Sequence, residues 1–157
     1  MKIESRPPFF PMMIDLRNKY VLIVGGGNVA TRRAKTLLTC GARVKAVSKN
    51  FAPEFPTVHE RFTRGFEVDD VTENFALVIA ATDDREINAL IQKLAHEKNI
   101  PVNVADTQSE CDFFFPSLIA CDNVAVSVSS AGLSYKLTQK LSERLRKVWA
   151  SWVNELR

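Results

Sequence analysis

The segment VLIVGGGNVA, residues 21–30, constrains the fold of this chain more than any other. Four apolar residues lead directly into three glycines, and a helix-compatible segment then runs to Cys40 and stops at Gly41. A buried-type strand, a glycine turn and a helix in this order are typical of the first βα unit of a dinucleotide-binding fold. The order therefore predicts a nucleotide-binding α/β fold.

Each small residue of the turn has its own expected role. Gly25 permits the tight turn, Gly27 lets the backbone approach a pyrophosphate, and Ala30 lets the helix pack on the strand. The N-terminus of the helix would then direct free N–H groups toward the phosphates. The alternative is a glycine-rich turn in some other kind of α/β protein.

Length and composition are those of a globular protein. The 157 residues, 46% hydrophobic and 25% charged, suffice for one domain with a substantial core. No apolar run approaches the roughly 20 residues of a membrane span, and the charged, proline-containing N-terminus is not expected to be a secretion signal. Three dispersed cysteines without a Cys-x-x-Cys pair indicate a reducing compartment and no zinc-binding motif. We therefore expect a cytoplasmic protein that neither enters a membrane nor binds a metal.

Positive charge is concentrated near the C-terminus. The net charge is +3, and the stretch from Lys136 to Arg157 alone carries six basic and two acidic residues. Such a stretch is either a solvated helix face or a basic wall that attracts a polyanionic small molecule. Nucleic acid is not an expected partner, because stacking aromatics do not alternate with the basic residues.

From residue 20 to residue 106 the pattern alternates between strands and helices. Strands are expected at residues 20–24, 42–47, 57–62, 74–81 and 101–105, and helices at 28–40 and after an N-cap at Thr82 or Asp83. The almost wholly apolar run at 74–81 is typical of a parallel strand that is covered on both faces. Residues 1–112 are therefore predicted to form a Rossmann-type parallel sheet.

Residues 113–157 have a different character. Two apolar strands are expected at 113–120 and 123–129, followed by a turn at 130–134 and a helix from about Tyr135. This helix carries an apolar stripe that includes Trp149 and Trp152. The region is predicted to be a dimerisation region or, alternatively, to complete the core of the monomer.

Polar residues follow several of the predicted strands. Ligands of open parallel sheets bind at the carboxyl ends of the strands, and the residues expected there, besides the glycines, are Ser48, Lys49, Asn50, Thr82, Asp83, Asp84 and Asp106. The acid that usually binds ribose, about 20 residues after the glycines, is missing. Because Lys49 suits a 2′-phosphate, the residues alone leave the choice between NAD and NADP open.

Asp106 is the candidate catalytic acid or base. It follows the buried-type strand 101–105, at the point where a nicotinamide and a substrate would meet. The alternative is an aspartate that caps a turn, because Thr107, Gln108 and Ser109 follow it.

Six segments in this order resemble the siroheme synthase family. They are FPMMIDL at 10–16, VLIVGGGNVATRRA at 21–34, IAATDD at 79–84, VNVAD at 102–106, FPS at 115–117 and VSVSSAG at 126–132. The resemblance covers residues 9–146, and the ordered set is far more specific than any single motif. Members of the family are precorrin-2 dehydrogenases, and some are also sirohydrochlorin ferrochelatases.

The resemblance implies a homodimer that uses NAD to oxidise precorrin-2, a tetrapyrrole, to sirohydrochlorin in siroheme biosynthesis, a branch of porphyrin biosynthesis. It also implies that the family's functional aspartate corresponds to Asp106. Nucleotide contacts are implied at Asn28, Val29, Lys49 and Asn50, and contacts to the tetrapyrrole at Ser129, Ser130 and Gly132.

Two departures from the family pattern stand out. The segment GLSY at 132–135 replaces the Gly-Thr-Ser-Pro of many members, so contacts to the substrate are expected to differ there. Many members also carry a further helical domain, which is expected to be absent because the sequence ends at Arg157. The leading hypothesis is the dehydrogenase. The alternatives are a bifunctional enzyme that also inserts iron and a nucleotide-sensing module without catalysis.

Overall fold

The computed structural model describes residues 9–156, which divide into two units. One unit is Met13–Phe113, and the other combines residues 9–12 with residues 114–156. Most of the N-terminal segment, in which no secretion signal is expected, consists of residues 1–8, which lie outside the described residues.

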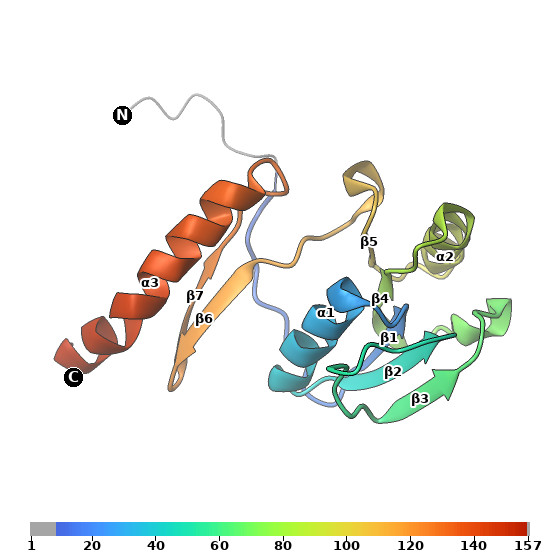
Figure 1. The fold of residues 1–157 in the computed structure, drawn as a ribbon, viewed down its shortest axis with the longest axis horizontal. Helices are drawn as coiled ribbons and strands as arrows, with labels where there is room; N and C mark the ends of the chain where they lie inside the picture. The colour runs from blue at the N-terminus through green and yellow to red at the C-terminus, as the bar shows by residue number, and fades with distance from the viewer. Residues whose placement is uncertain (1–8, 157) are drawn as a thin grey trace. The chain divides into compact units, whose positions relative to one another are not determined.

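The first unit contains a five-stranded parallel sheet with the order β3-β2-β1-β4-β5 (Figure 1). Its strands are β1 (Tyr20–Val24), β2 (Arg43–Ser48), β3 (Glu60–Thr63), β4 (Phe75–Ala80) and β5 (Val102–Val104). The central strand β1 pairs in parallel with both β2 and β4. The predicted Rossmann-type sheet is thus confirmed, with its topological switch point between β1 and β4.

Two helices cover the sheet. Helix α1 (Asn28–Thr39) connects β1 to β2, and α2 (Arg85–Glu97) connects β4 to β5. These connections run in opposite directions across the sheet, and right-handed crossovers therefore place the two helices on opposite faces. Short 3₁₀ turns, η1 (Val68–Asp70) and η2 (Gln108–Glu110), precede β4 and follow β5.

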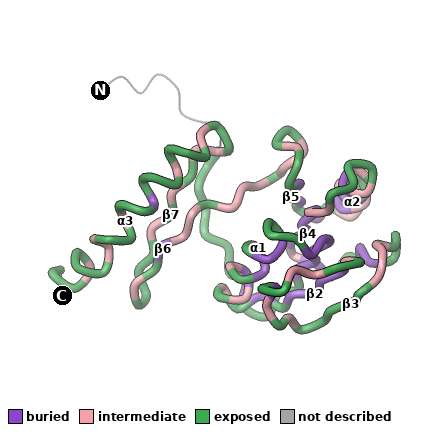
Figure 2. The backbone as a smooth tube through the Cα atoms, viewed as in Figure 1, coloured by how far each residue is buried: buried purple, intermediate pink, exposed green. Residues whose placement is uncertain are grey.

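The core lies on both faces of the central strands. Leu22 and Val24 of β1 share a buried cluster with Ile91 and Ala95 of α2. The alternate residues of β1 are buried as well, so this strand is covered on both faces. Figure 2 shows buried residues in the middle of the sheet. The ends of these rigid strands therefore provide fixed positions for site residues.

A buried ion cluster holds the β2–β3 edge of the sheet. Asp70, whose side chain is 2% exposed, binds Arg64 through two contacts of 2.7 Å and Lys45 through one of 3.3 Å. Burial raises the pKa of Asp70, but hydrogen bonds from Arg64, the Glu67 N–H and Lys45 outweigh it and lower the pKa below the ordinary value. Lys45 and Arg64 therefore serve the fold at this edge.

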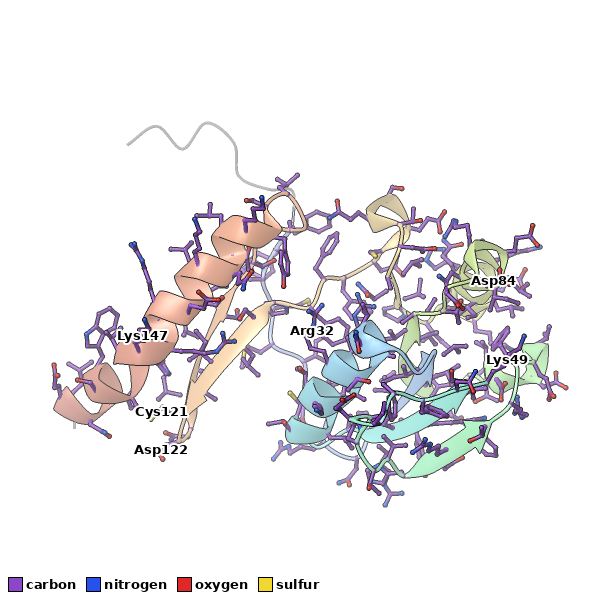
Figure 3. All side chains as sticks on the ribbon, in the orientation of Figure 1. Arg32, Lys49, Asp84, Cys121, Asp122 and Lys147 are labelled. Carbon is purple, nitrogen blue, oxygen red and sulfur yellow. The ribbon has the colours of Figure 1, made fainter. Side chains whose placement is uncertain are left out.

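The predicted cap of α2 is wrong. Asp84, rather than Thr82 or Asp83, caps the helix, because its carboxylate accepts from the N–H groups of Glu86 and Ile87 at 2.9 and 3.1 Å. The hydroxyl of Thr82 instead reaches Asn88, inside the first turns of the helix. Figure 3 labels Asp84 beside α2.

The second unit consists of an antiparallel hairpin and one long helix. Strands β6 (Ser117–Cys121) and β7 (Val124–Val128) pair with each other, and α3 (Tyr135–Glu155) lies beside them in Figure 1. Arg146 of α3 donates to the Ser117 hydroxyl at 2.9 Å. The expected strand pair and helix are present, although β6 begins only after Pro116, which has no N–H for the ladder.

Candidate functional site

The predicted site residues of the first unit lie at the carboxyl ends of its parallel strands. Gly25 and Gly27 follow β1, Ser48 ends β2, Thr82 follows β4 and Asp106 follows β5. Their strands are neighbours in the sheet, so these residues share one edge. This is the edge at which open α/β sheets bind their ligands.

The three glycines of the turn face different surroundings. Gly25 has a φ of +123°, and a Cβ there would lie 2.1 Å from the Ala81 carbonyl oxygen. A Cβ on Gly26 would lie 2.1 Å from the Asn50 carbonyl oxygen, whereas a Cβ on Gly27 would meet nothing within 4 Å. Gly25 and Gly26 are thus required by the chain's own packing, and Gly27 borders open space.

The start of α1 fits the pyrophosphate of a dinucleotide. Gly27 is the N-cap, it supplies no side-chain cap, and the first turn carries no acidic residue. The first N–H groups of a helix have no intrahelical partner, and here they belong to the exposed residues Asn28 and Val29. Unsatisfied donors, a partial positive charge and the space beside Gly27 together form a cradle for an anion.

The end of β2 offers polar groups without an acid. The Ser48 hydroxyl donates to the Asn50 carbonyl oxygen at 2.6 Å, so its hydrogen is used within the turn. Lys49, labelled in Figure 3, and Asn50 are exposed. A ribose at this position would therefore meet a lysine and an amide in place of the usual carboxylate.

The two carboxylate oxygens of Asp106 have different surroundings. Oδ2 accepts from Asn88 Nδ2 at 3.1 Å, whereas Arg85 Nη1 and Thr107 Oγ1 lie 3.4 Å from Oδ1. The side chain of Asp106 is 36% exposed. Oδ2 is thus held by a buried side chain, whereas the contacts that the described residues make with Oδ1 are 3.4 Å long.

Arg85 connects Asp106 to the turn that follows it. Its guanidinium pairs with Glu110 of η2 as well as with Asp106. The hydrogen bond to Glu110, followed by the charges of both carboxylates, raises the pKa of Arg85 above its ordinary value. Asp106 therefore lies beside a permanent positive charge.

Two residues of this arrangement, Arg85 and Asn88, are not among the residues predicted at this edge, and Gly26 was expected there without a role of its own. Asn88 is 0% exposed on the face of α2 that also carries Ile91. A lone amide on an apolar helix face was a signal in the sequence, because a buried amide must find partners. The contacts of Gly26 and Arg85 had no such local signal.

The predicted tetrapyrrole-binding residues belong to the second unit, in the turn between β7 and α3. The Ser129 hydroxyl accepts from the Ala131 N–H at 3.0 Å, and the Ser130 hydroxyl accepts from the Ser134 N–H at 2.9 Å. Gly132 has a φ of 80°, in the left-handed region. The structure brings these three residues together in one turn, and their contact with a substrate stays a prediction.

The cysteines of the chain are free thiols. Burial raises the pKa of Cys111, whose thiol donates to the Val104 carbonyl oxygen at 3.1 Å. Among residues 9–156 no three His, Cys, Asp or Glu side chains gather as a metal site would require, and no helix is long and apolar enough to cross a membrane.

Comparison with known proteins shows the family of this chain. The family model described as putative NAD(P)-binding matches residues 12–117. The probable multifunctional siroheme biosynthesis protein HemA of Ruminiclostridium josui is 38% identical over 144 residues, which are 88% of this chain and 28% of that protein. Siroheme synthase 2 of Aeromonas hydrophila is 41% identical over 148 residues, 89% of this chain and 30% of that protein.

The chain spans only about a third of these relatives' length or less. Among solved structures, SirC, precorrin-2 dehydrogenase, matches 93% of this chain and 76% of its own with a TM-score of 0.77 and 24% identity, which shows a shared fold. The chain belongs to the putative NAD(P)-binding family and, within it, is a relative of the siroheme synthases.

Proposed function

We propose that this chain is a precorrin-2 dehydrogenase, which oxidises precorrin-2 to sirohydrochlorin with NAD. The observation that carries the proposal is Asp106 at the same sheet edge as the glycine turn, with one carboxylate oxygen left to long contacts near solvent. The names of the siroheme synthase relatives support the choice of substrate.

Different residues of the chain are assigned to proton transfer and to dinucleotide binding in this reaction. Bound NAD⁺ supplies the hydride acceptor, and the oxidation also releases a proton from the macrocycle. Asp106 takes this proton through Oδ1, the oxygen that Asn88 does not hold. The dinucleotide would be held by Gly25, Gly27, Asn28 and Val29 at the pyrophosphate, and by Ser48, Lys49, Asn50, Thr82 and Asp83 at its two ends.

Substrate binding falls to the second unit in this proposal. Ser129, Ser130 and Gly132 form the turn that would face the tetrapyrrole. Exposed lysines and arginines of α3, among them Lys147 in Figure 3, would attract the carboxylates of the macrocycle. The free cysteines support a location in the reducing cytoplasm.

Purified protein given precorrin-2 and NAD⁺ is expected to form NADH and sirohydrochlorin, and absorbance spectroscopy can follow both products.

The protein is expected to bind NAD more tightly than NADP. The family resemblance implies this preference, although the side chain of Lys49 would suit the 2′-phosphate of NADP. Tighter binding of NADP in a titration would reverse the cofactor assignment. Iron insertion in a parallel reaction would favour the bifunctional enzyme, and NAD binding without turnover would favour a nucleotide-sensing module.

We also propose a homodimer formed by the second unit. Large apolar side chains of α3 remain exposed, with Leu137 at 54%, Leu141 at 43% and Trp152 at 49%. Among the described residues of this unit only Ile119 and Ser142 are buried. A two-stranded hairpin with one helix cannot bury its own faces, and it leaves both strand edges open. A second copy would cover this surface.

Sedimentation at micromolar concentration is expected to show a dimer. The double variant Leu137→Lys/Leu141→Lys should sediment as a monomer, because two charges would have to be buried in the interface. Gln139→Lys adds one positive charge to α3 between these positions and should remain dimeric, since Gln139 faces away from the Leu137–Leu141 stripe. A monomeric wild-type protein would contradict the proposal.

A further inference from the structure

The buried side chain of Asn88 makes four hydrogen bonds. Its Oδ1 accepts from the backbone N–H of Thr82 at 3.1 Å and from the Thr82 hydroxyl at 2.8 Å. Its Nδ2 donates to the Thr82 carbonyl oxygen and to Asp106 Oδ2, both at 3.1 Å. Since an amide offers two donors and two acceptor sites, Asn88 is fully satisfied at 0% exposure.

The backbone of Thr82 fixes the orientation of this amide. The N–H of Thr82 can only donate and its carbonyl can only accept, so an amide rotated by 180° would face like groups at both. Nδ2 is therefore directed at Asp106. Because Nδ2 only donates, the Asp106 oxygen that it contacts must accept, which occupies a lone pair of Oδ2 and leaves Oδ1 better placed to receive a proton.

We infer that Asn88 is a positioning residue that holds Oδ2 of Asp106 and so reserves Oδ1 for proton transfer. The inference rests on the proposed function, in which Asp106 is the general base. The contacts of Oδ1, with Arg85 and Thr107, are both 3.4 Å long, so a substrate proton can compete for this oxygen.

The same amide joins two loops of the site. Asn88 binds Thr82 on three of its four sites and Asp106 on the fourth, so it links the loop after β4 to the loop after β5. These loops lie at the end of the sheet where the nicotinamide half of a dinucleotide is expected. Asn88 thereby sets the place of the base relative to the cofactor as well as the oxygen that reacts.

The variant Asn88→Asp tests this role with almost no change of shape. It keeps the acceptor facing the Thr82 N–H but replaces Nδ2, which donates to the Thr82 carbonyl and to Asp106, by an oxygen. The two neighbouring carboxyl groups are then expected to retain a proton between them. The acidic limb of the pH profile of kcat is expected to shift to higher pH by about one pH unit or more. In the free protein, NMR of ¹³C-labelled aspartate carboxyls should show one proton retained to correspondingly higher pH.

Gln92→Glu is the matched control, because it adds the same charge one turn later on α2, beside His96. It should change neither the acidic limb nor the carboxyl titration of Asp106. A folded Asn88→Asp protein with a wild-type limb and a wild-type titration would overturn the inference. Should Asn88→Asp not fold, Asn88→Ser is expected to lower kcat about 10-fold or more with unchanged NAD affinity, and a wild-type kcat would overturn the inference equally.

Asp106→Asn, measured in parallel, separates this inference from the proposed function. Turnover retained in Asp106→Asn would refute the general base itself. An inactive Asp106→Asn beside an Asn88→Asp that titrates like wild type would refute only the positioning role of Asn88.

Discussion

We expect Asp106→Asn to lower kcat for precorrin-2 oxidation by about 100-fold or more, the usual scale for the loss of a positioned general base. The amide has no charge with which to take the macrocycle proton, although it keeps the shape of the carboxylate. The affinity for NAD should stay unchanged, because Asp106 follows β5 and the glycine turn follows β1. Single-turnover absorbance measures the first quantity and calorimetric titration the second.

Asp69→Asn serves as the control for this prediction. It removes an exposed carboxylate of η1 and should leave both kcat and NAD affinity at the wild-type level. Near-wild-type turnover in Asp106→Asn would reduce Asp106 to a turn residue. Failure of that variant to fold would support the alternative interpretation of Asp106 as a cap.

Gly27→Leu is expected to weaken NAD binding by at least about 100-fold, or roughly 2.7 kcal/mol, without unfolding the protein. A side chain at Gly27 would enter space free of protein atoms within 4 Å, which is the space that the pyrophosphate is proposed to occupy. The φ of Gly27 is −78°, which any residue adopts without strain. Titration with NAD measures the loss, and thermal unfolding checks the fold.

Gly25→Ala should behave in the opposite way. Its Cβ would collide with the Ala81 carbonyl at 2.1 Å, and its φ of +123° is unfavourable for alanine, so the protein itself should be destabilised. Gly65→Ala is the matched control, since its nearest contact would be an ordinary 3.6 Å to Lys49 Cε. Tight NAD binding by folded Gly27→Leu would show that the pyrophosphate does not approach this glycine.

Local patterns were enough to predict the sheet and the polar residues that follow its strands. The strand, glycine turn and helix at residues 20–39 depend on burial, turn geometry and helix propensity within one short segment, and β1 and α1 occur there. The apolar runs that became β4 and β5 also placed Asp106 at the carboxyl edge. The resemblance of six ordered motifs to the siroheme synthases is likewise a property of the chain alone.

The contacts that shape this edge depend on residues far apart in the chain. Asn88 meets Asp106 across 18 positions, Arg85 meets Glu110 across 25, and Gly26 packs against the carbonyl of Asn50. The Thr82 hydroxyl likewise donates to Asn88, and Asp84 rather than Thr82 caps the helix. The sequence by itself determined which elements form and where polar residues emerge, because periodicity and turn chemistry are local. Only the tertiary structure decided which oxygen of Asp106 is held and which glycine borders open space, because such contacts exist only once neighbouring strands bring distant loops to one edge.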